Sequence, residues 1–573
     1  FADPYKSTSR MYLKLKGQLL PYIYTSAASA SNLNTKNGDT GLPMIRAMFL
    51  EFPNDDYAYS KNMQYQYMFG DAFLVAPVYQ NTELNEETGA DIRNDIYLPK
   101  GETWIDYFTG EQYRGGTVIN NFDAPLWKLP LFVKNGSIVP MYEENNSPDK
   151  INRANRIVEF WPEGESTYTA YEDDGKSITN KTEKDEDYGV IDNISYGNHS
   201  ELTYKSVVNE EKKQATLTAE KVNVTGSYDG YSAEKNTTFV VNVSKKPTKL
   251  TAKNGSSTLK NVEVNSKAEF DAKTPNAGEA VFFYDANPTI ETYANEHETK
   301  IKEMVKDVKV APKLYVKFAK TNATENAQQL VIDGFVNDGN LPNDGENASL
   351  DAPKNIEYKP SSDSIALTWD EVEGATSYDV EADGIVYSML EKPAYTHSGL
   401  NYLEKHTYRV RSVNKDGHSE WSELKEVSTL DDPYRNVPKG MTVSYDQGNT
   451  PAAYAGKFEY MVDGDDVTEY SSRDAGVFNG KSFTIDMKKI YSINKLDYVF
   501  RQDGSNGTIK KFKLSYSNDG VNWKKYKDGE EINLTPTTQW PLGDKNKLNT
   551  QNVNARYATV DLEQFKARYI KVE

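Results

Sequence analysis

The segment "RQDGSNG" near the C-terminus carries two residues whose types and spacing could do chemistry, Arg501 and Asn506. Arginine presents a planar fork of N–H donors, and asparagine both donates and accepts hydrogen bonds. A sugar hydroxyl requires such converging donors and acceptors, and a sugar ring packs its C–H face against an aromatic side chain, for which Tyr470 and Trp540 are candidates. The alternative is structural, because Asn506-Gly507 is typical of a type I′ turn and Arg501 could form a surface ion pair.

A second group of polar residues lies in "DGDDVTEY", residues 463–470. Asp463, Asp465 and Thr468 offer oxygen atoms within one tight loop. Calcium binds about six to eight oxygen ligands, and such hard ligands suit calcium better than zinc. We therefore predict a structural calcium site in this loop. The alternative is a turn rich in aspartate that holds no metal.

Acidic residues also occur in the first third of the chain, where Glu51, Asp55 and Asp56 stand in "EFPNDD". Carboxylates can act as acid, base or sugar ligand, but aspartate at the start of a loop is also an ordinary turn residue. The segment "YEDDGKS" at 171–177 is acidic enough for a metal or for acid/base work, and its Asp-Gly pair is also typical of a hairpin turn. We favour the turn in both segments and assign no catalytic residue to this chain.

The composition excludes several classes of site and partner. Since none of the 573 residues is cysteine, disulfides, thiolate metal sites and cysteine nucleophiles are excluded. A formal net charge of -19 and a pI near 5.0 argue against a nucleic-acid partner, because phosphate binding draws on clustered lysine and arginine. No apolar run approaches the roughly 20 residues that span a bilayer, so we expect no membrane span.

The length predicts a modular chain, since 573 residues exceed what one hydrophobic core accommodates. The chain begins without methionine, and its last residues, "ARYIKVE", alternate like an unfinished strand. We therefore expect it to be a piece of a longer protein.

The beginning of the chain mixes helix and buried strand. Residues 10–30 have apolar side chains at helical spacing, interrupted at Pro21. The run 44–52 is nearly continuous in apolar residues, which suits a strand buried on both faces. A second helical pattern at 60–70 leads into another buried strand at 72–78. This order of elements is typical of an α/β fold.

Further along the chain, short strands are separated by Gly, Pro and Asn. Residues 290–308 are the one later helical candidate, and residues 335–353 lack apolar periodicity and are predicted to be a linker. Residues 354–430 alternate apolar and polar side chains as in an immunoglobulin-like sandwich. Trp369 and Tyr408 are its expected core markers, with Tyr408 placed to form a tyrosine corner.

Six ordered segments of the first third resemble the end of glycoside hydrolase family 31, which includes α-glucosidases, α-xylosidases and α-N-acetylgalactosaminidases. They are "LLPYIYT" (19–25), "GLPMIRAMFLEFPNDD" (41–56), "QYMFGDAFLVAPV" (66–78), "YLPKGETWIDYFTGEQYRGG" (97–116), "LPLFVKNGSIVP" (129–140) and "YEDDGKS" (171–177). The resemblance implies that the first three belong to the last strand and helices of a (β/α)8 barrel and the others to β domains behind it. One departure is Ala47, where many members carry proline after the arginine.

The same resemblance implies a retaining glycosidase, whose two catalytic carboxyl groups stand about 5–5.5 Å apart. In the family, both catalytic aspartates and the active-site histidine lie on earlier barrel strands, upstream of Phe1. This chain alone is therefore expected to be inactive. The resemblance also makes a carboxylate of the barrel the expected partner of Arg46.

The C-terminal part carries two further resemblances. Residues 354–430 resemble a fibronectin type III domain, and residues 436–573 resemble a discoidin-like, coagulation-factor type C domain of the family 32 carbohydrate-binding modules. The second rests on "MVDGDDVTEYSS" (461–472), "LDYVFRQDGSNGTIKKFKLSYSNDGVNW" (496–523) and "NARYATVDLEQFKARYIKVE" (554–573). It implies that Arg501 and Asn506 stand at the spacing used for galactose-type sugars. It also implies that Glu573 completes the calcium shell.

Together these patterns predict a multidomain, mostly β chain. In order, the expected units are the end of a (β/α)8 barrel at 1–90, a proximal C-terminal β domain at 91–148, a distal β-sandwich at 149–290, a helical or extended segment and linker at 291–353, a fibronectin type III sandwich at 354–430 and a discoidin-like carbohydrate-binding β-sandwich at 436–573.

The expected function is that of the C-terminal portion of a retaining exo-α-glycosidase that acts on α-glucosides or α-N-acetylgalactosaminides. We expect the full protein to be secreted or bound to the cell surface, in a bacterium. Its terminal module would bind glycans and raise the effective concentration of the substrate without new contacts at the active site. The alternative is a non-catalytic glycan-binding or adhesion protein with a vestigial barrel.

Overall fold

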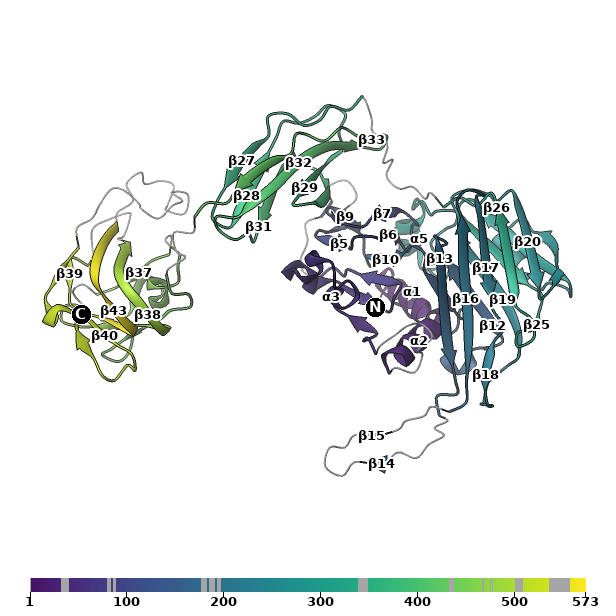
Figure 1. The fold of residues 1–573 in the computed structure, drawn as a ribbon, viewed down its shortest axis with the longest axis horizontal. Helices are drawn as coiled ribbons and strands as arrows, with labels where there is room; N and C mark the ends of the chain where they lie inside the picture. Colours follow the sequence, from purple (N-terminus) through teal and green to yellow (C-terminus); the bar gives the residue numbers. More distant parts are fainter. Residues whose placement is uncertain are drawn as a thin grey trace. The chain divides into compact units, whose positions relative to one another are not determined.

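The computed structural model describes residues 2–31, 41–79, 84–85, 89–176, 183–184, 191–192, 197–337, 349–431, 437–465, 468–474, 476, 478–499, 509–534 and 557–573. The chain divides into two compact units. Unit 1 comprises Phe1–Glu357, Thr368–Tyr395 and Thr407–Lys425, and unit 2 comprises Tyr358–Leu367, Thr396–His406 and Glu426–Glu573. Most of the regular structure is β-strand, as the sequence predicts (Figure 1).

Unit 1 begins with two helices, α1 (Tyr5–Gln18) and α2 (Leu20–Ala30), where the sequence predicts one interrupted helix. Pro21 lies in the first turn of α2, where its missing N–H costs no helical hydrogen bond. The chain stays nearly continuous at the break, because the amide of Leu19 still donates to the carbonyl of Leu15 at 2.9 Å. The predicted helix and its interruption are both confirmed.

The next segment differs from the prediction. The apolar run 44–52 forms only a short strand, β1 (Ile45–Arg46), and then a helical turn, α3 (Met48–Glu51). Arg46 and Glu51 explain the difference: five positions apart, their side chains would point to opposite faces of a strand, whereas the turn brings them together. The predicted helix at 60–70 is also replaced by shorter elements. These are the 3₁₀ turns η2 (Asp56–Tyr59) and η3 (Lys61–Tyr65), followed by strand β2 (Tyr67–Phe69).

A six-stranded sheet follows in the order β1-β2-β3-β10-β6-β7. Its further strands are β3 (Phe73–Val75), β6 (Thr103–Asp106), β7 (Gln112–Arg114) and β10 (Leu131–Lys134). Strand β3 is fully buried, as predicted for 72–78. Every pairing in this sheet is antiparallel, including that of β3 with β10, so β3 belongs to this sheet rather than to a parallel barrel. The predicted boundary at residue 90 therefore falls inside one sheet.

The largest part of unit 1 is a β-sandwich of two seven-stranded sheets (Figure 1). One sheet contains β11 (Ile138–Met141), β12 (Asn155–Phe160), β19 (Glu234–Asn242), β24 (Lys313–Phe318), β23 (Glu279–Asp285) and β22 (Lys260–Glu263) in this order, with β25 (Thr321–Asn322) beside β19. The other contains β13 (Glu165–Glu172), β16 (His199–Asn209), β17 (Gln214–Ala219), β26 (Gln328–Asp333), β20 (Lys249–Asn254) and β21 (Ser257–Thr258), with β18 (Asn223–Thr225) beside β16.

The sandwich extends beyond its predicted end at residue 290. Strands β24 and β26 lie in the interior of its two sheets, so much of the segment predicted as helix and linker belongs to the sandwich. The predicted helix at 290–308 is reduced to α5 (Thr299–Val305), and a short helix, α4 (Lys267–Ala272), precedes β23. Such boundaries are hard to predict because strands that are distant in sequence complete a sheet only in the folded chain.

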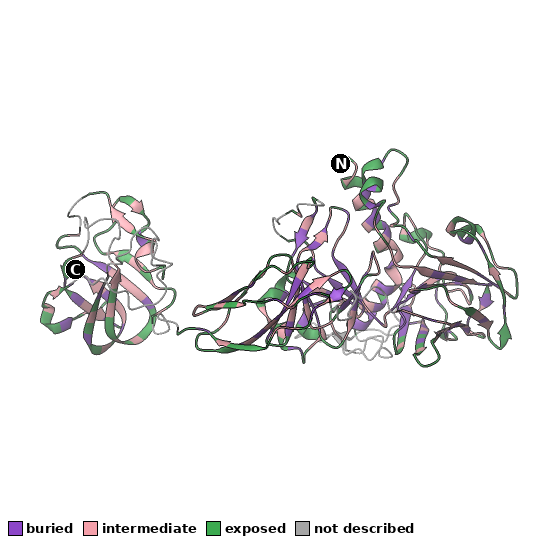
Figure 2. Ribbon diagram, turned by 90° about the horizontal axis from the view of Figure 1, so that it is seen from above, coloured by how far each residue is buried: buried purple, intermediate pink, exposed green. Residues whose placement is uncertain are grey.

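Strands β17 and β26 of the sandwich bury every second residue, the pattern of a sheet with one face on a core. Phe160, Phe239 and Phe318 meet in this core with ring centroids 5.0 Å apart in each neighbouring pair. Leu217 and Leu330 of the other sheet belong to the same cluster. Figure 2 colours such buried positions purple.

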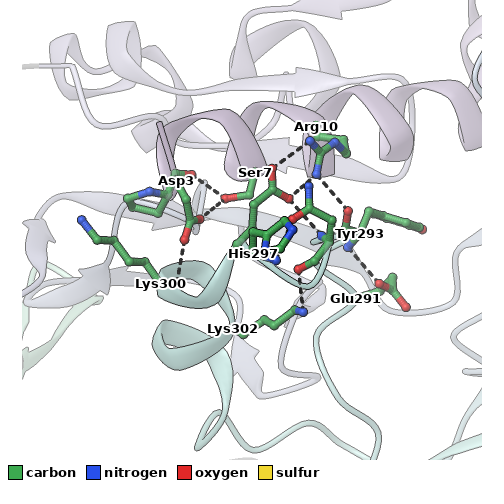
Figure 3. A network of polar contacts seen from close by, with 11 residues as sticks. Asp3, Ser7, Arg10, Glu291, Tyr293, His297, Lys300 and Lys302 are labelled. Atoms are coloured by element: carbon green, nitrogen blue, oxygen red, sulfur yellow. Dashed lines mark hydrogen bonds and ion pairs between the residues drawn. The ribbon is translucent and has the colours of Figure 1, made fainter. Parts of the chain in front are cut away.

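Helix α1 is tied to the segment before α5 by polar contacts (Figure 3). Arg10 forms an ion pair with Glu298, with Nη2 2.9 Å from Oε1. At the start of the helix, Asp3 accepts a hydrogen bond from the amide of Lys300 at 2.6 Å. These contacts fix the first helix against a part of the chain almost 300 residues away.

Residues 357–428 form the next group of strands. They are β27 (Glu357–Pro360), β28 (Ser364–Thr368), β29 (Ser377–Ala382), β30 (Ile385–Leu390), β31 (Ala394–Ser398), β32 (Lys405–Asn414), β33 (Gly417–His418) and β34 (Lys425–Ser428). In unit 1, β30 pairs in parallel with β8 (Thr117–Ile119), which pairs with β5 (Ile96–Leu98). The expected core markers Trp369 and Tyr408 are 6% and 0% exposed. The assignment of this group to a fibronectin type III domain stays a prediction.

The last part of unit 2 has its own apolar core, which includes Phe483, Leu514 and Ile570. Its main sheet contains β35 (Thr442–Tyr445), β38 (Phe483–Val499), β43 (Tyr557–Val572), β40 (Leu514–Ser517) and β41 (Lys524–Lys525) in this order. Two-stranded sheets add β36 (Ala453–Gly456) with β37 (Tyr470–Ser472), and β39 (Lys511–Phe512) with β42 (Ile532–Asn533).

Short elements complete the described part of the chain. They are β4 (Asp91–Arg93) paired with β9 (Phe122–Ala124), β14 (Glu183–Lys184) paired with β15 (Ile191–Asp192), and the 3₁₀ turns η4 (Pro148–Lys150), η5 (Phe458–Met461) and η6 (Tyr526–Gly529). Among the described residues, no helix has both the length and the apolar character needed to cross a bilayer.

Candidate functional site

In the first candidate region, the guanidinium of Arg46 contacts two carboxylates. Arg46 is 5% exposed, its Nε donates to Glu51 at 2.7 Å, and its Nη2 donates to Asp71 at 2.6 Å and also contacts Glu51. Burial alone would lower the pKa of Arg46, but the charges of Glu51 and Asp71 outweigh it and raise this pKa. The expected pairing of Arg46 with a carboxylate of the segment predicted as barrel, residues 1–90, is confirmed: its partners are Glu51 and Asp71.

The space beside Arg46 is too small for a sugar. A cavity of about 10 Å³ of room for the centres of water-sized spheres lies there, lined in part by Gly70, Asp71 and Tyr168. One water molecule requires about 10–15 Å³ by this measure. Because Glu51 is engaged by Arg46, the group serves to hold α3 and the loop before β3 in place.

Asp55 is a structural residue of the turn that follows. It is 8% exposed, its Oδ1 accepts from the amide of Tyr57 at 3.1 Å, and its Oδ2 accepts from the hydroxyl of Tyr97 at 2.6 Å. The prediction of a turn holds, although Asp55 is buried and only Asp56 is exposed to solvent.

The acidic segment 171–177 also forms a turn in its described part. Asp173 accepts from the amide of Gly175 and Asp174 accepts from the amide of Lys176, both at 2.8 Å. Gly175 has a φ of 67°, a left-handed conformation that favours glycine. The turn interpretation is confirmed, and these carboxylates cap backbone amides.

Trp421 lies against two cations of unit 1. The guanidinium carbons of Arg409 and Arg411 lie 4.8 Å and 4.5 Å from its ring centroid. Arg411 in turn donates to Asp379 at 2.9 Å. These contacts between cations and an aromatic ring stabilise neighbouring strands, so Trp421 has a packing role.

The candidate sugar site of the last module lies mostly outside the described residues. Arg501, Asn506 and Trp540 all belong to the part of the chain that the structure does not describe. Tyr470 is described, on β37. Its hydroxyl donates to the carbonyl of Pro451 at 2.8 Å, and its ring packs edge-on against Phe458 with centroids 5.0 Å apart. These contacts engage Tyr470 in the module's packing, and its role in sugar binding stays a prediction.

Three of the predicted calcium ligands do come together. The hydroxyl of Thr468 donates to Asp463 Oδ2 at 2.8 Å and to the carbonyl of Asp465 at 3.0 Å, and the amide of Asp465 donates to Asp463 Oδ1 at 3.0 Å. Asp463 and Asp465 are exposed, so their oxygen atoms are accessible. The bond from the amide of Asp465 to Asp463 also belongs to the aspartate-rich turn that is the alternative, so the calcium site stays a prediction.

Glu573 is placed by its backbone rather than by its carboxylate. Its amide and carbonyl both pair with Lys513, at 3.0 Å and 2.8 Å. Among the described residues, the carboxylates of Asp463, Asp465 and Glu573 do not form a group within 4.8 Å of one another. Its place in the calcium shell stays a prediction.

Trp523 of the same module is half-buried. Its indole N–H donates to the carbonyl of Gly520 at 3.1 Å, and the ammonium of Lys571 lies 4.3 Å from its ring centroid. The residue thus closes the turn between β40 and β41 and covers one side of a cation.

Sequence reasoning missed a buried polar group in the sandwich, in which Arg156, Glu172 and Lys235 lie together. A signal existed, because "EKNTTFVVN" on β19 alternates and places Lys235 on the same inward face as Phe239 and Val241. A lysine at an inward position of an alternating strand predicts a buried charge that requires a partner.

Two parts of the chain match known families. Residues 41–139 match the glycosyl hydrolase family 31 C-terminal domain, and residues 441–573 match the F5/8 type C domain. The resemblances predicted for these parts of the sequence are confirmed at this level.

Similar curated proteins are an isomaltosyltransferase of Sporosarcina globispora, 36% identical over 224 residues, and Alpha-glucosidase 2 of Bacillus thermoamyloliquefaciens, 31% identical over 202 residues. These matches cover 37% and 35% of this chain but 18% and 23% of those proteins, so the chain spans about a fifth of their length. Among solved structures, CBM32-1 from a family 31 glycoside hydrolase of Clostridium perfringens is 31% identical, with a TM-score of 0.18, over 25% of this chain and 87% of that chain.

Over part of its length, the chain is homologous to family 31 glycoside hydrolases, and a type C domain follows in the same polypeptide.

Proposed function

We propose that this chain is the C-terminal portion of a retaining exo-α-glycosidase that acts on α-linked glycans and is exported by a bacterium. The observation that carries the proposal is the presence, on one chain, of a family 31 C-terminal match and a type C match. The names of the similar proteins, an isomaltosyltransferase and an α-glucosidase, favour an α-glucoside over an α-N-acetylgalactosaminide as substrate.

The described acids support a scaffold role for this portion. A retaining glycosidase needs two carboxyl groups about 5–5.5 Å apart that are free to attack and to exchange a proton. Glu51 is bound to Arg46 and Asp55 to Tyr97, so neither is available for that work. The catalytic pair would therefore stand on the part of the longer protein that precedes this chain.

The test compares two proteins on 4-nitrophenyl α-glucoside and 4-nitrophenyl α-N-acetylgalactosaminide. The 573-residue chain should release no nitrophenol, and the longer protein from the same gene should hydrolyse one substrate with retention, observed by NMR of the first anomer formed. Hydrolysis by the shorter chain would overturn the placement of the catalytic pair. A longer protein without turnover, and without two aspartates on successive barrel strands, would instead be a non-catalytic glycan-binding protein.

We further propose that the last module binds glycans displaying galactose-type sugars through Arg501 and Asn506. Replacing Arg501 by Ala deletes charge-assisted hydrogen bonds of about 1.5–3 kcal/mol each, which predicts a tenfold to hundredfold weaker Kd for galactose. Arg473→Ala is the matched control, because Arg473 is 64% exposed and pairs with its neighbour Asp474. Equal Kd values for wild type and Arg501→Ala, at unchanged melting temperature, would place the sugar elsewhere, for example beside Trp540.

Calcium is the proposed structural ion of the same module, held by Asp463, Asp465, Thr468 and Glu573. An ion that binds only the folded module stabilises it by about 2.7 kcal/mol at a hundredfold excess over its Kd. The melting temperature of the module's transition should therefore rise with calcium and fall with a chelator. Asp463→Asn should abolish the response, whereas Asp474→Asn, a change at an exposed pair, should retain it. Identical melting in calcium and chelator would exclude the ion.

A further inference from the structure

A small cavity lies inside unit 1, between the two sheets of the sandwich and the start of helix α2. It offers about 20 Å³ of room for the centres of water-sized spheres, enough for one occupant of that size. Helix α2 contributes Pro21, and both sheets contribute polar side chains. The polar lining consists of Tyr142, Arg156, Tyr171, Glu172, Tyr204 and Lys235.

Arg156 on β12 is the first of two deeply buried cations in this lining, with 5% of its surface exposed. Its Nε donates to Thr237 Oγ1 at 2.7 Å, and its Nη2 lies 3.4 Å from Gln328 Oε1. Its Nη1 is also buried and forms no hydrogen bond with the described residues, and its guanidinium carbon lies 5.8 Å from the ring centroid of Tyr204. A buried N–H without an acceptor is unfavourable, and more so when it carries part of a positive charge.

Lys235 on β19 is the second cation, with 1% of its surface exposed. Its ammonium donates to the carbonyl of Arg153 at 2.8 Å and lies 3.4 Å from Glu172 Oε2. Burial lowers the pKa of Lys235, and the charge of Glu172 opposes this effect. The second oxygen of Glu172 accepts from the hydroxyl of Tyr142 at 3.1 Å.

The charges of this lining do not balance. Among the described residues that line the cavity, Arg156 and Lys235 stand against the single carboxylate of Glu172. An uncompensated charge in the protein interior is costly, and the interior normally supplies a counterion or a partner.

We propose that the cavity binds a small monovalent anion, chloride, which accepts a hydrogen bond from Arg156 Nη1. A chloride ion supplies the missing acceptor and balances the extra positive charge in one step. A water molecule would supply only the acceptor. The cavity volume excludes sulfate, phosphate, gluconate and sugars, because each is larger than one water-sized occupant.

The position of the anion gives it a structural consequence. Arg156 and Lys235 lie on neighbouring strands of one sheet, Glu172 lies on the other sheet, and Pro21 belongs to the helix that crosses them. Chloride would therefore join both sheets and helix α2, and the folded sandwich would be more stable when chloride is bound. By linkage, this stabilisation depends on the ratio of the free chloride concentration to its Kd.

The first test measures amide hydrogen exchange of β12 and β19 in the whole 573-residue chain. Sodium chloride and sodium bromide are compared with sodium gluconate at equal ionic strength. Exchange through opening of the sandwich should slow with the halides by the factor 1 + [halide]/Kd, which is about a hundredfold when the halide stands at a hundred times its Kd. Gluconate at the same ionic strength should give only a small salt effect. Equal protection in all three salts would overturn the proposal and leave a water as the occupant.

Variants locate the site. Arg156→Gln should lose the halide response, and Arg156→Lys, which keeps the charge, should retain part of it. Lys246→Gln is the matched control, because Lys246 forms an exposed pair with Glu263 on the surface of the sandwich, and it should keep the full response. A halide response that survives in Arg156→Gln would place the anion elsewhere and overturn the assignment.

If Arg156→Gln does not fold, the anion can still be located directly in crystals of the wild-type chain. Crystals of the wild-type chain in sodium bromide should show anomalous scattering within hydrogen-bond distance of Arg156 Nη1. A bromide peak there supports the site independently of any variant. Density for a water with no anomalous signal overturns it.

Discussion

The guanidinium of Arg46 is held by two carboxylates that differ in their access to water. The side chain of Glu51 is 14% exposed and that of Asp71 is 44% exposed, while that of Arg46 is 3% exposed. Arg46→Met would leave both carboxylates without their cation. Removing one partner of a buried ion pair costs about 3–5 kcal/mol, and we expect the lower end because water can reach Asp71. Denaturant unfolding of unit 1 measures the loss.

Lys267→Met is the control for that measurement. Lys267 pairs with Asp271 four positions along α4, and both side chains are about half exposed. Such a surface pair contributes about 0.3–0.5 kcal/mol. If Arg46→Met cost no more than Lys267→Met, the two carboxylates would not depend on Arg46.

Tyr22 joins helix α2 to the loop before β3 by one hydroxyl. That hydroxyl donates to the carbonyl of Phe69 at 2.7 Å and accepts from the amide of Ala72 at 2.9 Å, and Tyr22 is 0% exposed. Tyr22→Phe should destabilise unit 1 by about 1–3 kcal/mol, because a buried amide and carbonyl lose their partner. Tyr5→Phe, at a residue that is 59% exposed, should change nothing measurable in the same unfolding experiment. Equal unfolding of the two variants would contradict this role.

Single-residue roles could be predicted only where the partners are close in sequence. The turn at Asp173 to Lys176 is visible in the sequence because acceptor and donor stand two positions apart. Tyr97, which engages Asp55 42 positions away, carries no such local signal. Burial of Lys235 could have been inferred from strand alternation, but its partner Glu172 lies on another strand and in the other sheet.

At the scale of elements, the contact between α1 and the segment before α5 is sensitive to acid. The pKa of Glu298 is lowered to about 2, chiefly because Arg10 donates hydrogen bonds to its carboxylate. In an unfolded chain, the pKa of a glutamate side chain is about 4.3. A carboxyl with a lowered folded-state pKa contributes stability that is complete above its unfolded pKa and is lost as the pH falls toward the folded pKa. This contribution should therefore disappear between about pH 5 and pH 2.

Glu298→Gln tests that window, because it removes the charge and keeps the shape. The melting temperature of the wild type should exceed that of Glu298→Gln above pH 5, and the difference should shrink toward zero near pH 2. Glu296→Gln, at a side chain that is 85% exposed, should give no pH-dependent difference. A difference between wild type and Glu298→Gln that stays constant with pH would mean that the charge of Glu298 does not matter.

Elements were predictable where their pattern is regular and long. The interrupted helix at 10–30 and the alternating strands of the sandwich follow from periodicity alone. The run 44–52 misled because an apolar stretch does not distinguish a buried strand from a helical turn, and the ion pair of Arg46 with Glu51 decides in favour of the turn. Nothing in the sequence of residues 313–333 indicates that they belong to the sandwich, because their sheet partners are distant strands such as β19 and β17.

At the scale of the whole molecule, unit 1 joins segments that the sequence predicts as separate domains. Strand β30 pairs in parallel with β8, with Tyr387 opposite Val118. Around this pairing, the amide of Asn120 donates to the carbonyl of Ser388 at 3.2 Å. One sheet thus runs from the region of the family 31 match into residues 377–413. The sequence could not predict this junction, because strand pairing between domains leaves no periodic pattern in either strand.

This junction predicts what truncation will do. Val118 and Ile119 of β8 are 0% exposed, and β8 would become an edge strand in a chain that ends at residue 337, without β30. An apolar edge strand with open N–H and C=O groups pairs with other chains. We expect this chain to elute from a sizing column as dimers or larger assemblies.

A chain that ends at residue 431 keeps β30 and should elute at the size expected for the same oligomeric state as the full chain. Thr117→Lys in the shorter chain should restore the smaller size, because Thr117 is the half-buried residue of β8 and a charge on an edge strand opposes pairing. Identical behaviour of the two truncated chains would mean that β30 does not protect this edge.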